Sequence, residues 1–259
     1  MRGLLASFLA DVGYQLELMA QVIVRLASIP RRRELIADQL FQAGIKVVHV
    51  VLLVGLFIGM IVALQTGIEL SRFGQQDKIG TIVALSMARE MGPFITATIL
   101  AATVGSALAA EIGTMAVSEE LAALEVMSID RISFLVMPRV VSLAVMCPAL
   151  TVICDAIGII GGGFIADSQL NVGLSLYYDS AIEALQGGGW WLDLPKDVYS
   201  GLIKSFAFGI VISIISCAAG LRATSGALGV GNATRKAVRD SIIAIIVSNY
   251  FLSWVFFQG

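Results

Sequence analysis

The sequence predicts an all-α integral membrane protein: an N-terminal amphipathic interfacial helix, five transmembrane helices, and a cytoplasmic helix between spans two and three. Hydrophobic residues make up 58% of the chain and charged residues 14%, whereas a soluble domain carries roughly 25% charged residues. Residues 47–68, 91–110 and 241–259 contain no Asp, Glu, Lys or Arg. A helix needs about 20 mostly apolar residues to cross a bilayer, and in lipid every backbone polar group needs an internal partner. Runs of this length therefore predict membrane-spanning helices.

Residues 1–30 predict a helix that lies in the membrane interface. Asp11, Gln21 and Arg25 fall between apolar residues that recur every three or four positions: Leu5, Phe8, Val12, Leu16, Met19, Ile23 and Leu26. A cleaved signal peptide is the weaker alternative, because the first apolar stretch already ends at Asp11. Pro30 is expected to end the helix, and the three arginines at 31–33 to form a basic collar before the first span.

The five spans are expected at 46–68, 79–107, 134–164, 198–219 and 241–257. Gly55 and Gly59 on span one form a G-x-x-x-G pair, a spacing that lets two helices approach closely. Span two contains Gly92-Pro93. Because proline removes a helix hydrogen bond and clashes with the preceding turn, we expect a kink near residues 89–93.

Three connecting segments are polar. Segment 111–130 holds five acids among methionines and leucines, and it predicts a surface helix or a helix pair. Segment 166–197 is an acidic insert in which Trp190 and Trp191 predict an aromatic anchor at the level of the lipid headgroups. Segment 221–240 is expected to be a polar connection, and its basic residues are Arg222, Arg235, Lys236 and Arg239.

The distribution of Lys and Arg predicts the orientation. The N-terminal flank and segment 221–240 are both basic, and an even number of spans separates them, so both are expected in the cytoplasm. The N-terminus is then cytoplasmic, the C-terminus periplasmic, and the 166–197 insert periplasmic. Segment 111–130 is cytoplasmic despite its acidity, because Asp and Glu contribute little to this rule. With no internal repeat or linker, residues 1–259 are expected to form a single membrane domain.

The sequence lacks the common motifs of catalysis. It contains no G-x-x-x-x-G-K-[ST], no H-E-x-x-H and no G-x-S-x-G. Cys147, Cys154 and Cys217 lie in apolar segments without metal-binding spacing, and the lone histidine, His49, stands near the start of span one. The net charge of −2 gives no electrostatic basis for nucleic-acid binding. We therefore expect neither enzymatic activity, nor a metal, nor a cofactor.

Charges within a span are costly and mark interiors, cavities or pairs, and four ionisable residues of the predicted spans stand out: Arg89, Glu90, Asp155 and Lys204. Arg89 and Glu90 are adjacent, and neighbours on a helix do not face each other, so they need not pair. They either reach the headgroup layer or line a polar spot in a substrate cavity. Asp155 is either a buried hydrogen-bonding acid or a pathway residue. Lys204 is expected to extend to the outer interface.

The most distinctive stretch is 109–127, AAEIGTMAVSEELAALEVM. It resembles the signature of the MlaE (YrbE/TGD) family of lipid-transporter permeases. The similarity continues along the chain in GLFIGM at 55–60 with Leu64 and Gln65, in AREMGP at 88–93 and in LIKS at 202–205. The N-terminal helix and the 166–197 insert are similar to the family in character only.

The resemblance implies a homodimer of five-span subunits in the bacterial inner membrane. It also implies a cytoplasmic ATP-binding subunit, a lipid-shuttling subunit with MCE domains, and an outward-facing cavity that holds phospholipid. The lipid would lie near Leu64, Gln65, Arg89, Glu90 and Met91. The cytoplasmic segment would be the ATPase-coupling helix, docking through Glu111, Gly113, Met115, Glu119, Glu120, Leu124, Glu125 and Met127.

The sequence thus predicts the permease subunit of an ATP-driven ABC transporter that moves phospholipid or a similar lipid between membranes. The missing phosphate-binding loop requires ATP hydrolysis on a separate subunit. The alternative is an ion-coupled secondary transporter that uses Arg89, Glu90 or Asp155. An intramembrane lipid-modifying enzyme is a third option, and it lacks a credible nucleophile, base or metal set.

Overall fold

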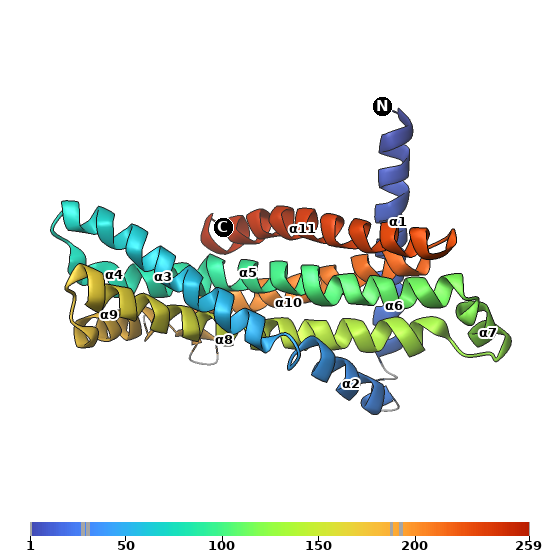
Figure 1. The fold of residues 1–259 in the computed structure, drawn as a ribbon, viewed down its shortest axis with the longest axis horizontal. Coiled ribbons are helices and arrows are strands. Elements are labelled where there is room, and N and C mark those ends of the chain that lie inside the picture. The colour runs from blue at the N-terminus through green and yellow to red at the C-terminus, as the bar shows by residue number, and fades with distance from the viewer. Residues whose placement is uncertain (1, 27–28, 30–31, 187–188, 192–193, 259) are drawn as a thin grey trace. The chain divides into compact units, whose positions relative to one another are not determined.

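The computed structural model describes residues 2–26, 29, 32–186, 189–191 and 194–258, and nearly all of them are helical. Five helical stretches among them are long and apolar enough to cross a membrane: Val48–Arg72, Gln76–Val117, Ile132–Leu170, Lys196–Leu221 and Gly226–Phe257. The prediction of an all-α, multi-pass membrane protein is confirmed (Figure 1). The described residues add one short antiparallel pair, β1 (Gly189–Trp191) with β2 (Leu194–Pro195).

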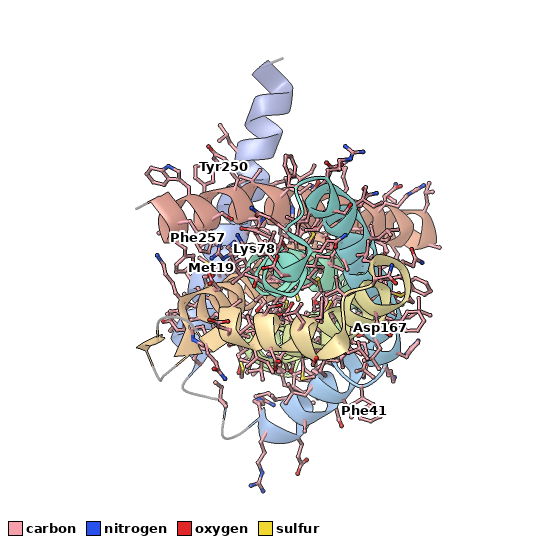
Figure 2. All side chains as sticks on the ribbon, turned by 90° about the vertical axis from the view of Figure 1, so that its left-hand side faces the viewer. Met19, Phe41, Lys78, Asp167, Tyr250 and Phe257 are labelled. Carbon is pink, nitrogen blue, oxygen red and sulfur yellow. The ribbon has the colours of Figure 1, made fainter. Side chains whose placement is uncertain are left out.

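The N-terminal region forms two helices, α1 (Arg2–Arg25) and α2 (Arg33–Ala43). The expected interfacial helix corresponds to α1. Pro30 and Arg31, the expected helix end and the first arginine of the collar, lie outside the described residues. The second helix was not predicted, because eleven residues offer only a short apolar stripe; on it Ile36 is buried while Phe41 is exposed and points outward (Figure 2).

Span one is the single helix α3 (Val48–Arg72), and it packs through glycine against α8 (Met137–Leu170). Gly55 and Gly59 are buried. A Cβ on Gly59 would overlap the backbone of Gly158, and one on Gly55 would press on Cys154. The close helix contact that the G-x-x-x-G spacing predicts is therefore present.

Span two alternates between helix types. It runs through η2 (Gln76–Lys78), α4 (Ile79–Ser86), η3 (Met87–Met91), α5 (Gly92–Leu100), η4 (Ala101–Gly105) and α6 (Ser106–Val117). The two segments η3 and η4 are π-helical, a form that appears mostly as single turns inside α-helices and often at functional sites. The irregularity expected at residues 89–93 is found as η3, directly before Gly92-Pro93.

Segment 111–130 forms a pair of helices, which is one of the two forms that its sequence predicts. Helix α6 ends at Val117, and the short α7 (Glu120–Val126) follows after a tight reversal (Figure 1). Glu119 at the turn has φ 63°, in the left-handed region. The chain then reverses direction and enters α8 through the π-helical segment η5 (Ile132–Val136).

The 166–197 insert is more ordered than its polar composition predicts. Helix α8 continues to Leu170, and α9 (Leu174–Gln186) then packs along α4 (Figure 1). Tyr177 of α9 is fully buried, and its hydroxyl donates a hydrogen bond to the carbonyl of Ile159 at 3.0 Å. The side chains of Trp190 and Trp191 lie outside the described part of the chain, so the aromatic anchor stays a prediction.

Spans four and five are α10 (Lys196–Leu221) and α11 (Gly226–Gln258). The prediction that 221–240 is a polar connection was wrong, because residues from Gly226 onward already belong to α11. A helix that continues beyond the apolar layer still satisfies its own backbone hydrogen bonds, so polarity does not mark where it begins. The boundary lies at Ser225 and Gly226, whose φ values of 70° and 68° break the helix.

The chain forms two compact units, each assembled from three segments. Unit 1 comprises residues 1–45, 100–146 and 208–248, and unit 2 comprises 46–99, 147–207 and 249–259. The core of unit 1 includes Leu18, Val22, Ile112, Met137 and Cys217. Fully buried residues of unit 2 include Met87, Leu150, Cys154 and Tyr177. Cys147, Cys154 and Cys217 are all buried and unbridged, which agrees with their place in apolar segments of the sequence.

Candidate functional site

Unit 2 contains a cluster of charged and polar side chains from spans two, four and five. We call it the charged cluster; its members are Arg89, Glu90, Asp197, Lys204, Asn249, Ser253 and Phe257. Arg89 and Glu90 lie on η3, Asp197 and Lys204 on α10, and the last three on α11. Ionisable groups inside spans are rare and mark functional sites by default.

Lys204 is the centre of the cluster. Its side chain is fully buried, and its ammonium group donates to Glu90 Oε1 at 2.6 Å, to Ser253 Oγ at 2.8 Å and to the backbone carbonyl of Arg89 at 3.0 Å. These three bonds use all three ammonium protons. The prediction that Lys204 extends to the outer interface was wrong, because a matched set of acceptors on two other helices holds it inward.

The helix irregularity supplies one of those acceptors. In an α-helix the N–H of residue 93 would bond to the carbonyl of residue 89, but Pro93 has no N–H. The Arg89 carbonyl therefore cannot accept the α-helical bond from residue 93, and Lys204 Nζ donates to it at 3.0 Å. The Gly92-Pro93 pair thus does more than interrupt the span, since it creates a binding position for a cation from α10.

Glu90 is held at both carboxylate oxygens. Oε1 accepts from Lys204 and lies 2.8 Å from Ser253 Oγ, and Oε2 accepts from Asn249 Nδ2 at 2.9 Å. The expectation that Arg89 and Glu90 need not pair with each other is confirmed, since they have different partners. Asn249 and Ser253 were missed as site residues; their i, i+4 spacing on an otherwise apolar span was the available signal.

Arg89 is the most exposed charged residue of the cluster. Its guanidinium pairs with Asp197 and lies 5.1 Å from the ring centre of Phe257, whose place on α11 is labelled in Figure 2. Its side chain is 40% exposed, whereas that of Lys204 is 0% exposed. Asp197 was expected only as one acid of the insert. The cluster is therefore closed at Lys204 and open at Arg89, and Glu90, with a side chain that is 35% exposed, lies between them.

The other predicted lipid-binding residues lie at two places in unit 2. Met91 is on η3 next to the cluster and is 38% exposed. Leu64 and Gln65 lie on α3, where Leu64 is half-buried and Gln65 is exposed. The structure thus joins Arg89, Glu90 and Met91 in one π-helical turn and places Leu64 and Gln65 on a separate helix. A lipid cavity near these five residues stays a prediction.

Asp155 packs against the start of α5. A Cβ on Gly92 would overlap Asp155 Oδ1, so the carboxylate fits there only because residue 92 is glycine. Among the described residues, Oδ1 has no hydrogen-bond partner. Asp155 as a whole is half-buried, its Oδ1 atom is buried within unit 2 beside the charged-cluster turn, and both predicted roles stay open. His49 is exposed near the start of α3.

The predicted ATPase-coupling residues divide into a packed and an exposed group, both in unit 1. Glu111 pairs with Arg139 at 3.1 Å, and Gly113 is buried, with room for a Cβ only in contact with Ala223. Met115 and Leu124 are half-buried. Glu111 is itself exposed on α6, and the other exposed residues follow the end of that helix: Glu119, Glu120, Glu125 and Met127. A docking surface would therefore be built from the turn and α7 rather than from the whole segment.

The end of this segment is tied to the N-terminal helix. Arg25 of α1 pairs with Asp130, the residue before the third span. Burial raises the pKa of the Asp130 carboxyl, but the hydrogen bond from Arg25, together with backbone N–H bonds, outweighs burial and leaves that pKa below its ordinary value. Asp130 is therefore ionised near neutral pH, and the pair anchors α1 within unit 1.

Comparison with known proteins places this architecture in a family. The family model described as Permease MlaE matches residues 36–255. A protein of Rickettsia conorii named a probable ABC transporter permease protein is 40% identical over 229 residues, which cover 88% of this chain and 85% of that protein. A Synechocystis protein with the same description is 38% identical over 93% of this chain and 89% of its own length.

A plant relative extends the comparison. The chloroplastic protein TRIGALACTOSYLDIACYLGLYCEROL 1 of Arabidopsis thaliana is 37% identical over 239 residues, which cover 92% of this chain and 66% of that protein. The range 36–255 that the family model matches includes η3, α7 and every member of the charged cluster except Phe257. The chain belongs to the MlaE permease family.

Proposed function

We propose that this chain is the membrane-spanning permease subunit of an ATP-driven ABC transporter that moves phospholipid, or a similar lipid, between membranes. The observation that carries the proposal is the match, over 88% of the chain, to a protein named as an ABC transporter permease. The sequence itself has no phosphate-binding loop. ATP is therefore hydrolysed on a separate subunit, and this chain has a transport role without enzymatic activity.

The charged cluster supports a lipid substrate. The spans are apolar apart from a few ionisable residues, and the exposed edge of the cluster is the Arg89 guanidinium beside Met91. A guanidinium recognises phosphate through paired N–H donors, and apolar surface accommodates acyl chains. The name of the Arabidopsis relative is that of a glycerolipid. In this proposal Leu64, Gln65, Arg89, Glu90 and Met91 lie near the bound lipid.

The proposal includes partners. A cytoplasmic ATP-binding subunit would dock on the turn at Glu119 and on α7, and an MCE-domain subunit would pass the lipid onward. Two copies of this chain would form a homodimer in the bacterial inner membrane. The exposed acids Glu119, Glu120 and Glu125 with exposed Met127 give α7 a polar surface with an apolar contact, which suits a protein partner.

An ion-coupled secondary transporter is the competing function. Coupling would require Arg89, Glu90 or Asp155 to bind and release an ion during transport. Both oxygens of Glu90 already accept hydrogen bonds, Oε1 from Lys204 and Ser253 and Oε2 from Asn249. These hydrogen bonds favour a Glu90 carboxylate that stays fixed over one that binds and releases an ion during transport.

The experiment that tests the proposal is purification of the tagged chain from its native membranes, followed by mass spectrometry of proteins and lipids. We expect an ATP-binding protein and phospholipid to co-purify. In proteoliposomes the complex should then move fluorescent phospholipid with ATP and not with a non-hydrolysable analogue. Lipid or solute movement driven by an ion gradient, with no ATPase present, would favour the secondary transporter.

A further inference from the structure

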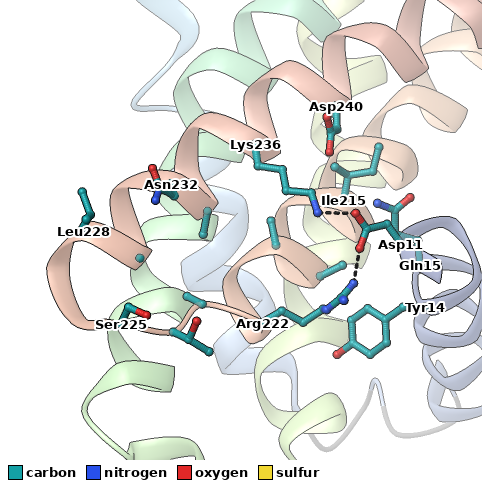
Figure 3. Close-up of a pocket in the computed structure, with 16 residues that line it drawn as sticks. Asp11, Tyr14, Gln15, Ile215, Arg222, Ser225, Leu228, Asn232, Lys236 and Asp240 are labelled. Atoms are coloured by element: carbon teal, nitrogen blue, oxygen red, sulfur yellow. Dashed lines mark hydrogen bonds and ion pairs between the residues drawn. The ribbon is translucent and has the colours of Figure 1, made fainter. Parts of the chain in front are cut away.

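Unit 1 contains a cavity of about 430 Å³ that no part of the transport proposal uses. Its walls come from α1, from the end of α10 and from the first turns of α11 (Figure 3). Polar and charged side chains line it, among them Asp11, Tyr14, Arg222, Asn232 and Lys236. The cavity is thus a polar site where the amphipathic N-terminal helix meets the turn between the last two spans.

The turn between α10 and α11 shapes one wall. Ser225 and Gly226 both have positive φ, which reverses the chain within a few residues. A Cβ on Gly229 would overlap the carbonyl of Thr224, so the turn can fold this closely on α11 only because residue 229 is glycine. Backbone constraints therefore fix the cavity between the two helix ends.

Two cations in the cavity share one acid. Arg222 and Lys236 both donate to the Asp11 carboxylate, and the Arg222 guanidinium lies 5.3 Å from the ring centre of Tyr14 (Figure 3). Asp240, the other acid of the lining, pairs with Arg239 at 2.9 Å. The lining thus holds two bases and two acids, and because Asp240 is engaged by Arg239, Arg222 and Lys236 share the Asp11 carboxylate.

Arg222 and Lys236 each keep N–H donors that are not directed at Asp11 and that remain accessible. Arginine carries five N–H donors and lysine three, and one donor of each is directed at Asp11. Their side chains are 49% and 39% exposed. A tetrahedral oxyanion entering the cavity would meet donors from both bases, an arrangement typical of phosphate recognition.

Apolar side chains lie at the rim and on the neighbouring helix. Leu228 lines the cavity and is 71% exposed, while Leu9 and Leu16 of α1 are 66% and 57% exposed. An amphipathic helix with such residues lies at the membrane surface. A ligand with an anionic head and apolar tails matches this combination better than a small soluble anion does.

We propose that this cavity binds the phosphate of an anionic phospholipid from the membrane leaflet in which α1 lies, with Arg222 and Lys236 as the phosphate ligands and Leu228 beside an acyl chain. Asp11 is the internal competitor, because it occupies the same donors. The site belongs to unit 1 and is distinct from the lipid position proposed near Arg89 in unit 2. It goes beyond the transport function, and binding alone tests it.

The test uses the full-length protein with a photo-crosslinking amino acid at Leu228, reconstituted in phosphatidylcholine nanodiscs with increasing fractions of radiolabelled phosphatidylglycerol. The readout is the phosphatidylglycerol fraction that gives half-maximal capture. We expect Arg222→Gln and Lys236→Gln each to raise it by about fivefold, the effect of one basic residue near an anionic surface. Asp11→Asn should lower it, because the internal competitor loses its charge.

The control variant is Lys46→Gln, which removes an exposed base from outside the cavity and should leave capture unchanged. If Asp11→Asn, Arg222→Gln and Lys236→Gln all lower capture alike, the ion pairs only maintain the fold and the site is refuted. Equal capture of phosphatidylcholine would also refute it. If glycerol phosphate at the same concentration displaced the lipid, the proposal of a lipid ligand would be refuted and the ligand would be a soluble phosphate.

Discussion

The ammonium group of Lys204 lies 2.6 Å from the Glu90 carboxylate, although 114 residues separate the two in the sequence. The pair joins span four to span two, and Ser253 adds span five to the same contact. Removing one partner of a buried ion pair leaves an uncompensated charge, which costs far more than the pair contributes as a whole. The structure therefore predicts a clear asymmetry between single and double variants.

Glu90→Gln should destabilise the protein by on the order of 3 kcal/mol, because Lys204 would remain buried without a counter-charge. Lys204→Met should be harmful too, since it leaves Glu90 charged. The double variant Glu90→Gln with Lys204→Met should recover part of the loss, and thermal unfolding in detergent measures all three. Additive losses in the double variant would show that the two residues are not energetically coupled.

Gly59→Ala should destabilise unit 2, because the new Cβ would overlap the backbone of Gly158. Overpacking of this kind costs roughly 1 to 3 kcal/mol. The matched control is Gly231→Ala on α11, where a Cβ meets nothing within 4 Å; alanine there should be neutral or stabilise by up to about 1 kcal/mol. Equal melting temperatures for both variants would contradict the tight α3–α8 contact.

The predicted orientation can be tested with single cysteines and a membrane-impermeant thiol reagent. Gln75 and Asp179 are exposed in the structure and should label from the periplasmic side. Glu120 and Asn232, also exposed, should label only after the membrane is permeabilised. Cys147, Cys154 and Cys217 are buried, so the native background should be low. Protection at Asp179 together with labelling at Asn232 from outside would show that the predicted topology is wrong.

Glu119→Lys with Glu120→Lys should weaken binding of the ATP-binding subunit while the chain still inserts into the membrane. Both residues are exposed, Glu119 at the turn before α7 and Glu120 as the first residue of α7, and like charges placed together at an interface cost several kcal/mol. The double variant Asp179→Lys with Glu183→Lys, at two exposed positions of α9, is the control with the same charge change and should retain the subunit. If the Glu119→Lys, Glu120→Lys double variant retained a fully active complex, this turn would not be the docking site of the ATP-binding subunit.

Photo-crosslinkers at Leu64 and Met91 should capture radiolabelled phospholipid more efficiently than one at Val152. Val152 on α8 is 50% exposed and reports the lipid that surrounds any membrane protein. Arg89→Gln should reduce capture at Met91, because it removes the exposed cation next to that position. Equal capture at all three positions would mean that they sample the surrounding bilayer and that no separate lipid site exists there.

Local rules explain which parts of the structure could be predicted. Apolar length placed the spans, the G-x-x-x-G spacing identified the α3 face that packs on Gly158, and Gly92-Pro93 located the break in span two. Helices α2 and α9 and the early start of α11 were missed. They are amphipathic or polar helices stabilised by packing, as with the buried Tyr177, and hydropathy alone does not distinguish them from loops.

The sequence by itself determined the membrane environment, the number of spans and the family, because each depends on composition or on runs of neighbouring residues. It also singled out Arg89 and Glu90, since ionisable groups in apolar runs are conspicuous. Only the tertiary structure decided their partners. Lys204 points inward rather than to the interface because Glu90, Ser253 and the Arg89 carbonyl, far apart in the sequence, converge on its ammonium group, and no local pattern encodes that convergence.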